Sequence, residues 1–210
     1  MASLNQFREW LLPYCRVEID DVSLAKLLTY SKLLQKWNRQ MALTSLTDEQ
    51  EIAQTLFGES LAACHLIGPK CGRLADVGSG AGFPGLVIKI VRPAMEVFLI
   101  EPNLRKSVFL NEVSSALELN GLSVIRGMVG AGIPKLEIPQ LDWITSRGLV
   151  VRQEILNFSS TALSEGGKIL FWTNAQGLTK IQVDKNWAWS NSTLLHGTKE
   201  RFIAVGQRRA

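Results

Sequence analysis

The residues with the clearest chemical meaning form a glycine-rich stretch, RLADVGSGAGFPGLVI, at positions 73–88. An apolar strand is followed by a glycine turn, and the apolar run from Leu86 then indicates a buried helix. Glycines allow positive φ and let backbone N–H groups approach a ligand that side chains would keep away. The stretch therefore predicts a turn that binds a nucleotide-like ligand, and a glycine turn without a ligand is the alternative.

Two classes of cofactor match this turn. Residues 80–85, GAGFPG, fit the dinucleotide pattern G-x-G-x-x-G. Residues 76–82, DVGSGAG, fit the acid-x-G-x-G-x-G turn of S-adenosylmethionine (SAM) methyltransferases. Pro84 favours SAM, because it lacks an N–H where a pyrophosphate-binding helix would offer one. We expect Asp76, Gly80 and Gly82 to contribute to a SAM site.

Further candidates follow other predicted strands. Glu101 ends a strand over 95–101, 19 residues after Gly82, where an acid can accept both hydroxyls of a ribose. Capping the next helix is its alternative role, and the two roles can coexist. Arg147 ends a strand over 141–147, where open α/β sheets bind ligands, so we expect it to contact a carboxylate, a phosphate or a developing charge. A surface arginine is the alternative.

The remaining elements alternate along the chain. Strands are expected over 74–77, 95–101, 122–125, 141–147 and 168–173, with helices over 84–91, 103–119 and 152–163 between them. Two short runs over 190–195 and 201–205 then indicate an antiparallel hairpin. This pattern predicts an α/β fold of the class I SAM-dependent methyltransferase type, with a mostly parallel seven-stranded sheet. The length leaves no room for the second half of a dinucleotide-binding domain.

The first 68 residues are expected to be helical. A helix over 4–12 ends at Pro13, a second carries the apolar stripe from Leu24 to Trp37, and Thr47-x-x-Gln50 resembles a capping box that starts a third. We expect residues 1–68 to form a cap on the SAM-binding domain at 69–210, giving one compact unit. Lys32, Lys36 and Arg39 share a helix face, which could contact RNA phosphates or simply face solvent.

Composition sets broad limits on the function. The 210 residues are 46% hydrophobic and 20% charged, which suits one α/β domain with a modest extension. A formal charge of +4 and a pI near 9.1 permit an RNA partner without requiring one. Cys15, Cys64 and Cys71 form no pattern, so neither a disulfide framework nor a metal site is expected. We expect a cytoplasmic protein without a membrane span.

The same residues resemble one family closely. The chain is similar to the bacterial 16S rRNA methyltransferase G family, also called RsmG or GidB, over about three quarters of its length. The similarity rests on short motifs that follow one another in the right order. They are WN at 37–38 with LT at 43–44, DVGSGAGFPG at 76–85, IE at 100–101, Lys106 with FL at 109–110, and SR at 146–147.

The resemblance implies a function and a set of contacts. Family members methylate N7 of one guanine in the 530 loop of 16S rRNA (the family's G527) with SAM, so 16S rRNA or the small ribosomal subunit is the implied partner. The implied cofactor contacts are Gly78, Phe83, Val129, Gly130 and Arg147. The family usually has an acid where this chain has Gly130, and alanine where it has Gly148.

The chemistry needs little from the protein. Guanine N7 has a free lone pair and SAM carries an activated methyl group, so alignment of the two suffices and no general base is expected. No residue is therefore assigned a catalytic role, although Arg147 could contribute. The alternatives are a non-catalytic module that binds rRNA or a protein, and a SAM methyltransferase that acts on another RNA. Cytosine C5 methylation is disfavoured, because all three cysteines precede the glycine turn.

Overall fold

The computed structural model describes residues 2–68, 71–130, 138–148, 153–190 and 193–209. Its sheet has the strand order β3-β2-β1-β4-β5-β8-β6, and β7 also pairs with β8. Strands β1 to β5 pair in parallel, whereas β8 runs antiparallel to its neighbours. The strands are β1 (Arg73–Val77), β2 (Glu96–Ile100), β3 (Leu122–Ile125), β4 (Leu141–Ser146), β5 (Leu163–Asn174), β6 (Trp187–Trp189), β7 (Thr193–Leu194) and β8 (Arg201–Arg208). The predicted mostly parallel sheet with an antiparallel end is confirmed.

The predicted number of strands is wrong. In the described residues, eight strands fill seven positions, because β6 and β7 lie one after the other along the same edge of β8. Gly206 pairs with Ile169 of β5 on one side and with Trp189 of β6 on the other. The expected hairpin is present as β7 and β8. The sequence analysis missed β6, whose three residues are too short a run for alternation to be recognised.

Helices cover both faces of this sheet. In chain order they are α1 (Leu4–Leu11), α2 (Asp21–Met41), α3 (Glu49–Ile52), α4 (Glu59–Leu61), α5 (Cys64–Ile67), α6 (Gly85–Val91), α7 (Leu104–Ala116), α8 (Gln153–Ala162) and α9 (Ala175–Gln182). A 3₁₀ turn at Leu12–Tyr14 follows α1, and a π-helical turn at Ala53–Gly58 joins α3 to α4. Helix α9 was not expected, because glycine disfavours a helix and the segment shows little apolar periodicity. In the structure, Ile181 is the residue of α9 that is buried. Arg152, the first residue of the helix predicted over 152–163, lies outside the described residues.

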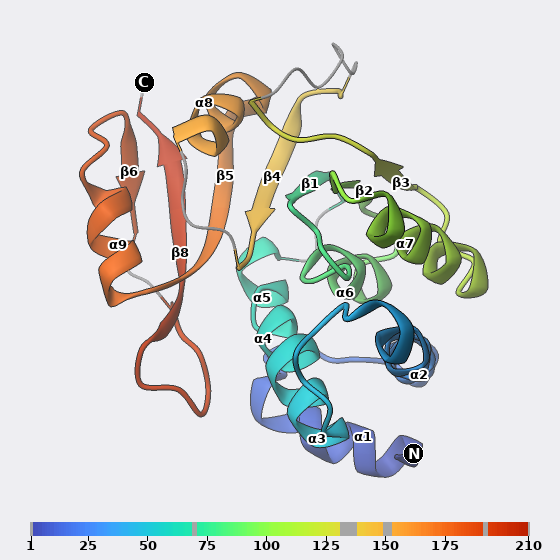
Figure 1. The fold of residues 1–210 in the computed structure, drawn as a ribbon. Helices are drawn as coiled ribbons and strands as arrows, with labels where there is room; N and C mark the ends of the chain where they lie inside the picture. The colour runs from blue at the N-terminus through green and yellow to red at the C-terminus, as the bar shows by residue number, and fades with distance from the viewer. Residues whose placement is uncertain (1, 69–70, 131–137, 149–152, 191–192, 210) are drawn as a thin grey trace.

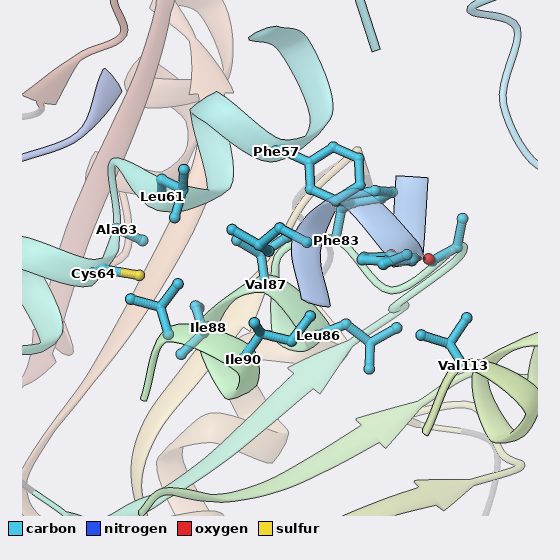
Figure 2. Close-up of a cluster of buried hydrophobic side chains, with 14 of the residues drawn as sticks. Phe57, Leu61, Ala63, Cys64, Phe83, Leu86, Val87, Ile88, Ile90 and Val113 are labelled. Atoms are coloured by element: carbon cyan, nitrogen blue, oxygen red, sulfur yellow. Dashed lines mark hydrogen bonds between the residues drawn. The ribbon is translucent and has the colours of Figure 1, made fainter. Parts of the chain in front are cut away.

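Alternate side chains of the strands enter two cores. Leu74 and Leu99 belong to a cluster on one face, while Ala75 and Ile100 belong to a cluster on the other. The first cluster includes residues of α1, α2, α6 and α7, and the second includes residues of α8 and α9. Figure 2 shows part of the first cluster, where Phe57 and Leu61 from the N-terminal segment face Phe83, Val87 and Ile90. A helical cap and the sheet thus share one apolar interior.

The N-terminal helices gather at one end of the sheet. Figure 1 shows α4 and α5 beside the tip of β4, with α1 and α2 farther along. Asp20 caps α2 through its side chain, which accepts a hydrogen bond from Ser23 N at 2.6 Å. The capping box predicted at Thr47 is wrong, because Asp48 is the N-cap and accepts a hydrogen bond from Glu51 N at 2.8 Å. The domain boundary near residue 68 stays a prediction.

Candidate functional site

The glycine turn leaves β1 in a conformation that requires glycine. Gly78, Gly80 and Gly82 have φ values of 73°, 59° and 98°, which side chains rarely adopt. A Cβ at Gly80 would meet only the carbonyl of Gly78 at 3.9 Å, whereas one at Gly82 would lie 2.7 Å from the Tyr30 hydroxyl. Gly80 therefore faces open space, and Gly82 faces packed protein.

Asp76 is buried beneath this turn and does not face the open space beside Gly80. Its carboxylate accepts hydrogen bonds from the Thr145 hydroxyl at 2.8 Å and from Gly85 N at 3.1 Å, and the residue is fully buried. Burial raises the pKa of Asp76 to about 6, while the bonds from Thr145 and Gly85 oppose the rise. Asp76 thus ties the turn and the start of α6 to β4, and a direct contact with a cofactor stays a prediction.

Glu101 lies against the turn from the end of β2. One carboxylate oxygen accepts from Gly80 N at 2.8 Å and the other from Asn103 N at 2.8 Å. The predicted alternative, in which Glu101 caps the next helix, is wrong, because Asn103 is the N-cap of α7 and Glu101 only accepts from its backbone N–H. A carboxylate has about four acceptor positions, and two are taken here. The other two are compatible with the ribose role predicted for Glu101.

Tyr30 of α2 holds the turn from the other side, and the sequence analysis missed it. Its hydroxyl donates a hydrogen bond to the carbonyl of Ala81. Its ring stacks on Phe83 at 5.1 Å, and Phe57 meets Phe83 edge-on at 5.0 Å. Phe83, a predicted cofactor contact, therefore has its side chain in the core. Tyr30 belonged to the apolar stripe predicted for this helix, and only its hydroxyl could have indicated a further role.

Val129 and Gly130 lie where the chain has left β3. Val129 is buried and shares the second core with Ile155 of α8. Gly130 has a φ of 93°, and a Cβ there would lie 2.8 Å from Cγ of Glu154. Glu154 thus occupies the space into which a side chain at position 130 would extend. Any larger residue at 130 would require Glu154 to move.

Arg147 follows β4 and points to the N-terminal helices. Its guanidinium donates to the carbonyls of Thr55 and Leu56 at 2.7 and 3.0 Å, and it pairs with Glu59 at 3.0 Å. A π-helical turn shifts its hydrogen bonds to the fifth residue, which leaves carbonyls available for such a donor. The interpretation of Arg147 as an exposed surface residue is wrong, since its side chain is only 13% exposed.

A pocket of about 560 Å³ opens beside Arg147 at the carboxyl ends of β4 and β5. Its polar lining includes Glu59, Arg147, Lys180 and Arg201, and Trp172 contributes an aromatic wall. Asp76 of β1 is in register with Thr145 of β4, so the glycine turn and this pocket follow neighbouring strands. Both features therefore lie at the carboxyl edge of the sheet, where open α/β sheets bind ligands.

Lys32, Lys36 and Arg39 are all exposed on α2. Their contact with RNA stays a prediction. No group of three or more His, Cys, Asp or Glu side chains that could hold a metal ion occurs in the described part of the chain. Among those same residues, no helix is long and apolar enough to cross a membrane.

Comparison with known families identifies the family of this chain. The family model described as "GidB: rRNA small subunit methyltransferase G" matches residues 23–203. This chain belongs to that family. The resemblance recognised from the short motifs is thereby confirmed.

Individual relatives agree with this membership. A ribosomal RNA small subunit methyltransferase G from Burkholderia multivorans is 36% identical over 155 residues, which are 73% of this chain and 68% of the relative. One from Roseiflexus castenholzii is 33% identical, over 73% of this chain and 66% of the relative. One from Acetivibrio thermocellus is 39% identical, over 52% of this chain and 45% of the relative. The matched part thus spans about half to two thirds of these three relatives.

Solved structures show the same fold at low identity. The glycopeptide N-methyltransferase MtfA in complex with SAM has a TM-score of 0.63 and 10% identity, over 73% of this chain and 94% of that structure. TrmN from Thermus thermophilus has a TM-score of 0.59 and 16% identity, over 71% and 49% of the two chains. These matches show that the chain has the Rossmann-like fold of the two solved structures.

Proposed function

We propose that this protein transfers a methyl group from SAM to N7 of a specific guanine in the 530 loop of 16S rRNA. The single observation that carries the proposal is the family match over residues 23–203, joined to a glycine turn whose geometry fits the cofactor. The product of the cofactor would be S-adenosylhomocysteine. The rRNA or the small ribosomal subunit is the proposed partner, and the cytoplasm the proposed compartment.

The residues at the turn suit SAM. A Cβ at Gly80 would project into open space, so a ligand can approach the backbone there. Glu101 lies 2.8 Å from Gly80 N and retains acceptor positions for a ribose. We assign Gly78, Gly80 and Gly82 to the turn that holds the cofactor, and Val129 and Gly130 to the edge of its adenine pocket. Asp76, Phe83 and Arg147 support the site through the turn and the cap.

The reaction asks for alignment and not for proton transfer. SAM supplies a methyl group on a sulfonium, and guanine N7 attacks with a lone pair that needs no base. The protein would hold the purine so that N7 faces the donor. Positive charge develops on the purine as the N7–methyl bond forms, and a nearby carboxylate lowers the energy of that charge. Glu59 is a buried carboxylate in the neighbouring pocket.

A calorimetric titration with SAM, and separately with NAD, tests the cofactor. We expect saturable binding of SAM only. Gly78→Asp should abolish that binding while the protein remains folded, because a side chain there would enter the space beside the turn. Methylated guanines would then be mapped in 16S rRNA from a strain lacking the enzyme, after incubation with the protein and SAM. Absence of both SAM binding and methylation would favour a non-catalytic rRNA-binding module.

A further inference from the structure

The pocket at the ends of β4 and β5 holds one acid among several basic side chains. Glu59 is 2% exposed, yet it lines the cavity together with Arg147, Lys180 and Arg201. Burial raises the pKa of the Glu59 carboxyl, and Arg147 and Arg201 act in the opposite direction. Burying a carboxylate is costly unless it is paired. A fold that retains one at the base of an open pocket has placed an acceptor where a ligand can reach it.

Three contacts fix the position of Glu59. One carboxylate oxygen lies 3.0 Å from Nη2 of Arg147, and the other lies 2.7 Å from Nη2 of Arg201. The indole N–H of Trp172 donates to the backbone carbonyl of Glu59 at 3.1 Å. Each carboxylate oxygen can accept a second hydrogen bond. The group is therefore held rigidly, with one acceptor position left on each oxygen.

Two adjacent acceptors match one nucleobase in RNA. Guanine carries two neighbouring donors, N1–H and the N2 amino group, on its Watson–Crick edge. Adenine and cytosine each pair one amino donor with a ring acceptor, and uracil places its single N–H between two carbonyls. A carboxylate can thus accept two parallel hydrogen bonds from guanine alone, as it does from a guanidinium fork. Guanine N7 lies on the opposite edge of the purine and remains free.

We propose that this pocket takes the target nucleotide and that Glu59 selects guanine by accepting from N1–H and the N2 amino group. The inference rests on the proposed function and names the residue that would give it base specificity. With the Watson–Crick edge on Glu59, N7 is directed away from it and is available to the methyl donor. The volume of about 560 Å³ is in the range of small-molecule sites and accommodates one nucleotide.

The basic side chains suit the phosphate of the same nucleotide. Lys180 of α9 is exposed and lines the pocket, and the side chain of Arg201 at the start of β8 is 49% exposed. Arg147 is enclosed by its contacts with the π-helical turn. Lys180 can thus meet a phosphate, and Arg201, which pairs with Glu59 at 2.7 Å, still exposes half of its side chain beside it. Base selection and phosphate binding are assigned to different residues and can be tested separately.

The first test compares nucleotides on the unaltered protein. Binding of guanosine 5′-monophosphate (GMP), inosine 5′-monophosphate (IMP) and 1-methyl-GMP would be measured by NMR titration in the presence of SAM. IMP lacks the amino group and 1-methyl-GMP lacks the N1 proton. Since a hydrogen bond to a charged acceptor is worth about tenfold or more in affinity, each should bind at least about tenfold more weakly than GMP. Equal affinities for the three, or no binding of GMP at millimolar concentration, would overturn the proposal.

Two variants then separate the roles. Glu59→Gln should bring the affinities for GMP and IMP within about threefold of each other, because an amide offers only one acceptor. Lys180→Ala should weaken both nucleotides by a similar factor of about three and keep the preference for GMP. Lys185→Ala is a matched control, since Lys185 is exposed and does not line the pocket. A full GMP preference in a folded Glu59→Gln protein would overturn the assignment of Glu59.

The nucleotide experiment and the methylation experiment can fail separately. A protein that prefers GMP over IMP but methylates no rRNA would support this pocket assignment and contradict the methyltransferase activity. A protein that methylates the 530 loop but binds GMP, IMP and 1-methyl-GMP equally would contradict the assignment of this pocket and support the methyltransferase activity. Thermal unfolding of each variant, followed by circular dichroism, identifies any change that arises from loss of the fold.

Discussion

The ring of Tyr30 stacks on the ring of Phe83 at a centroid distance of 5.1 Å and an interplanar angle of 17°. The Tyr30 hydroxyl also donates to the carbonyl of Ala81. One side chain of α2 thus contacts the glycine turn twice. The helical cap is therefore a part of the proposed cofactor site, because it fixes the backbone that would surround the ligand.

This relationship predicts a difference between two substitutions. Tyr30→Phe keeps the stacking but leaves a buried carbonyl without its donor, so the free energy of unfolding should fall by about 1–2 kcal/mol. Affinity for SAM should fall with it, because the turn is less firmly held. Tyr30→Ala should cost about 3–5 kcal/mol through the cavity that it leaves. Urea unfolding and SAM titration measure both quantities.

Tyr14→Phe provides the control for this pair. Tyr14 is also buried but lies in the 3₁₀ turn after α1, where it packs against His196. Removal of its hydroxyl should leave SAM affinity unchanged. If Tyr14→Phe and Tyr30→Phe lowered SAM affinity equally, the special role of Tyr30 at the turn would be rejected.

Two neighbouring glycines should respond differently to the same change. Both have positive φ, so alanine costs roughly 1 kcal/mol of backbone energy at either position. Gly80→Ala adds a methyl group to open space and should mainly weaken SAM binding. We expect a loss of affinity of about tenfold or more, because the methyl group would displace the ligand. Gly82→Ala also places Cβ 2.7 Å from the Tyr30 hydroxyl and should destabilise the fold further.

Calorimetry and thermal unfolding distinguish these outcomes. Gly80→Ala should keep a melting temperature near that of the unaltered protein, with a small decrease, while its SAM affinity collapses. The opposite pattern, strong SAM binding in Gly80→Ala, would show that the ligand does not occupy the space above this glycine.

Asp76 predicts how stability depends on pH. Its pKa is raised from 3.8 to about 6 in the fold, so the folded state holds the proton more tightly than the unfolded state. The resulting contribution to stability is complete below pH 3.8 and is lost as the pH rises through about 6. A shift of this size corresponds to up to about 3 kcal/mol.

Asp76→Asn isolates this contribution. The free energy of unfolding of the unaltered protein, minus that of Asp76→Asn, should decrease between pH 4 and pH 7 by up to about 3 kcal/mol. Urea unfolding at half-unit intervals of pH measures the difference, and other titrating groups cancel in it. A difference that is constant, or that increases with pH, would contradict the raised pKa.

The exposed residues of α2 predict a salt-dependent effect on RNA binding. Lys36→Glu combined with Arg39→Glu should weaken binding to a fragment of 16S rRNA and reduce the slope of log affinity against log salt by about 1–2. Arg16→Glu combined with Lys185→Glu makes the same change of charge at exposed positions off α2. Filter binding at several salt concentrations compares the two. Equal slopes would assign the α2 residues to an ordinary solvated face.

The sequence by itself determined the class of the fold and the order of β1 to β5. Apolar periodicity and turn residues placed β1 to β5 within a few residues, apart from an early start of β5 at Leu163. These features depend on neighbours along the chain, which a sequence displays directly. The DVGSGAGFPG motif similarly indicated the cofactor turn, because glycine is required there by local backbone geometry.

Tertiary structure alone decided which groups the site residues meet. Arg147 looked suited to a ligand, but its guanidinium contacts the carbonyls of Thr55 and Leu56, about 90 positions earlier in the chain. The sequence analysis did not single out Glu59, and the fold brings it between Arg147 and Arg201. Such contacts depend on how distant segments pack, and residue spacing carries no record of that. The sequence thus indicated the glycine turn, while the three-dimensional arrangement was needed to find the pocket that Glu59 lines.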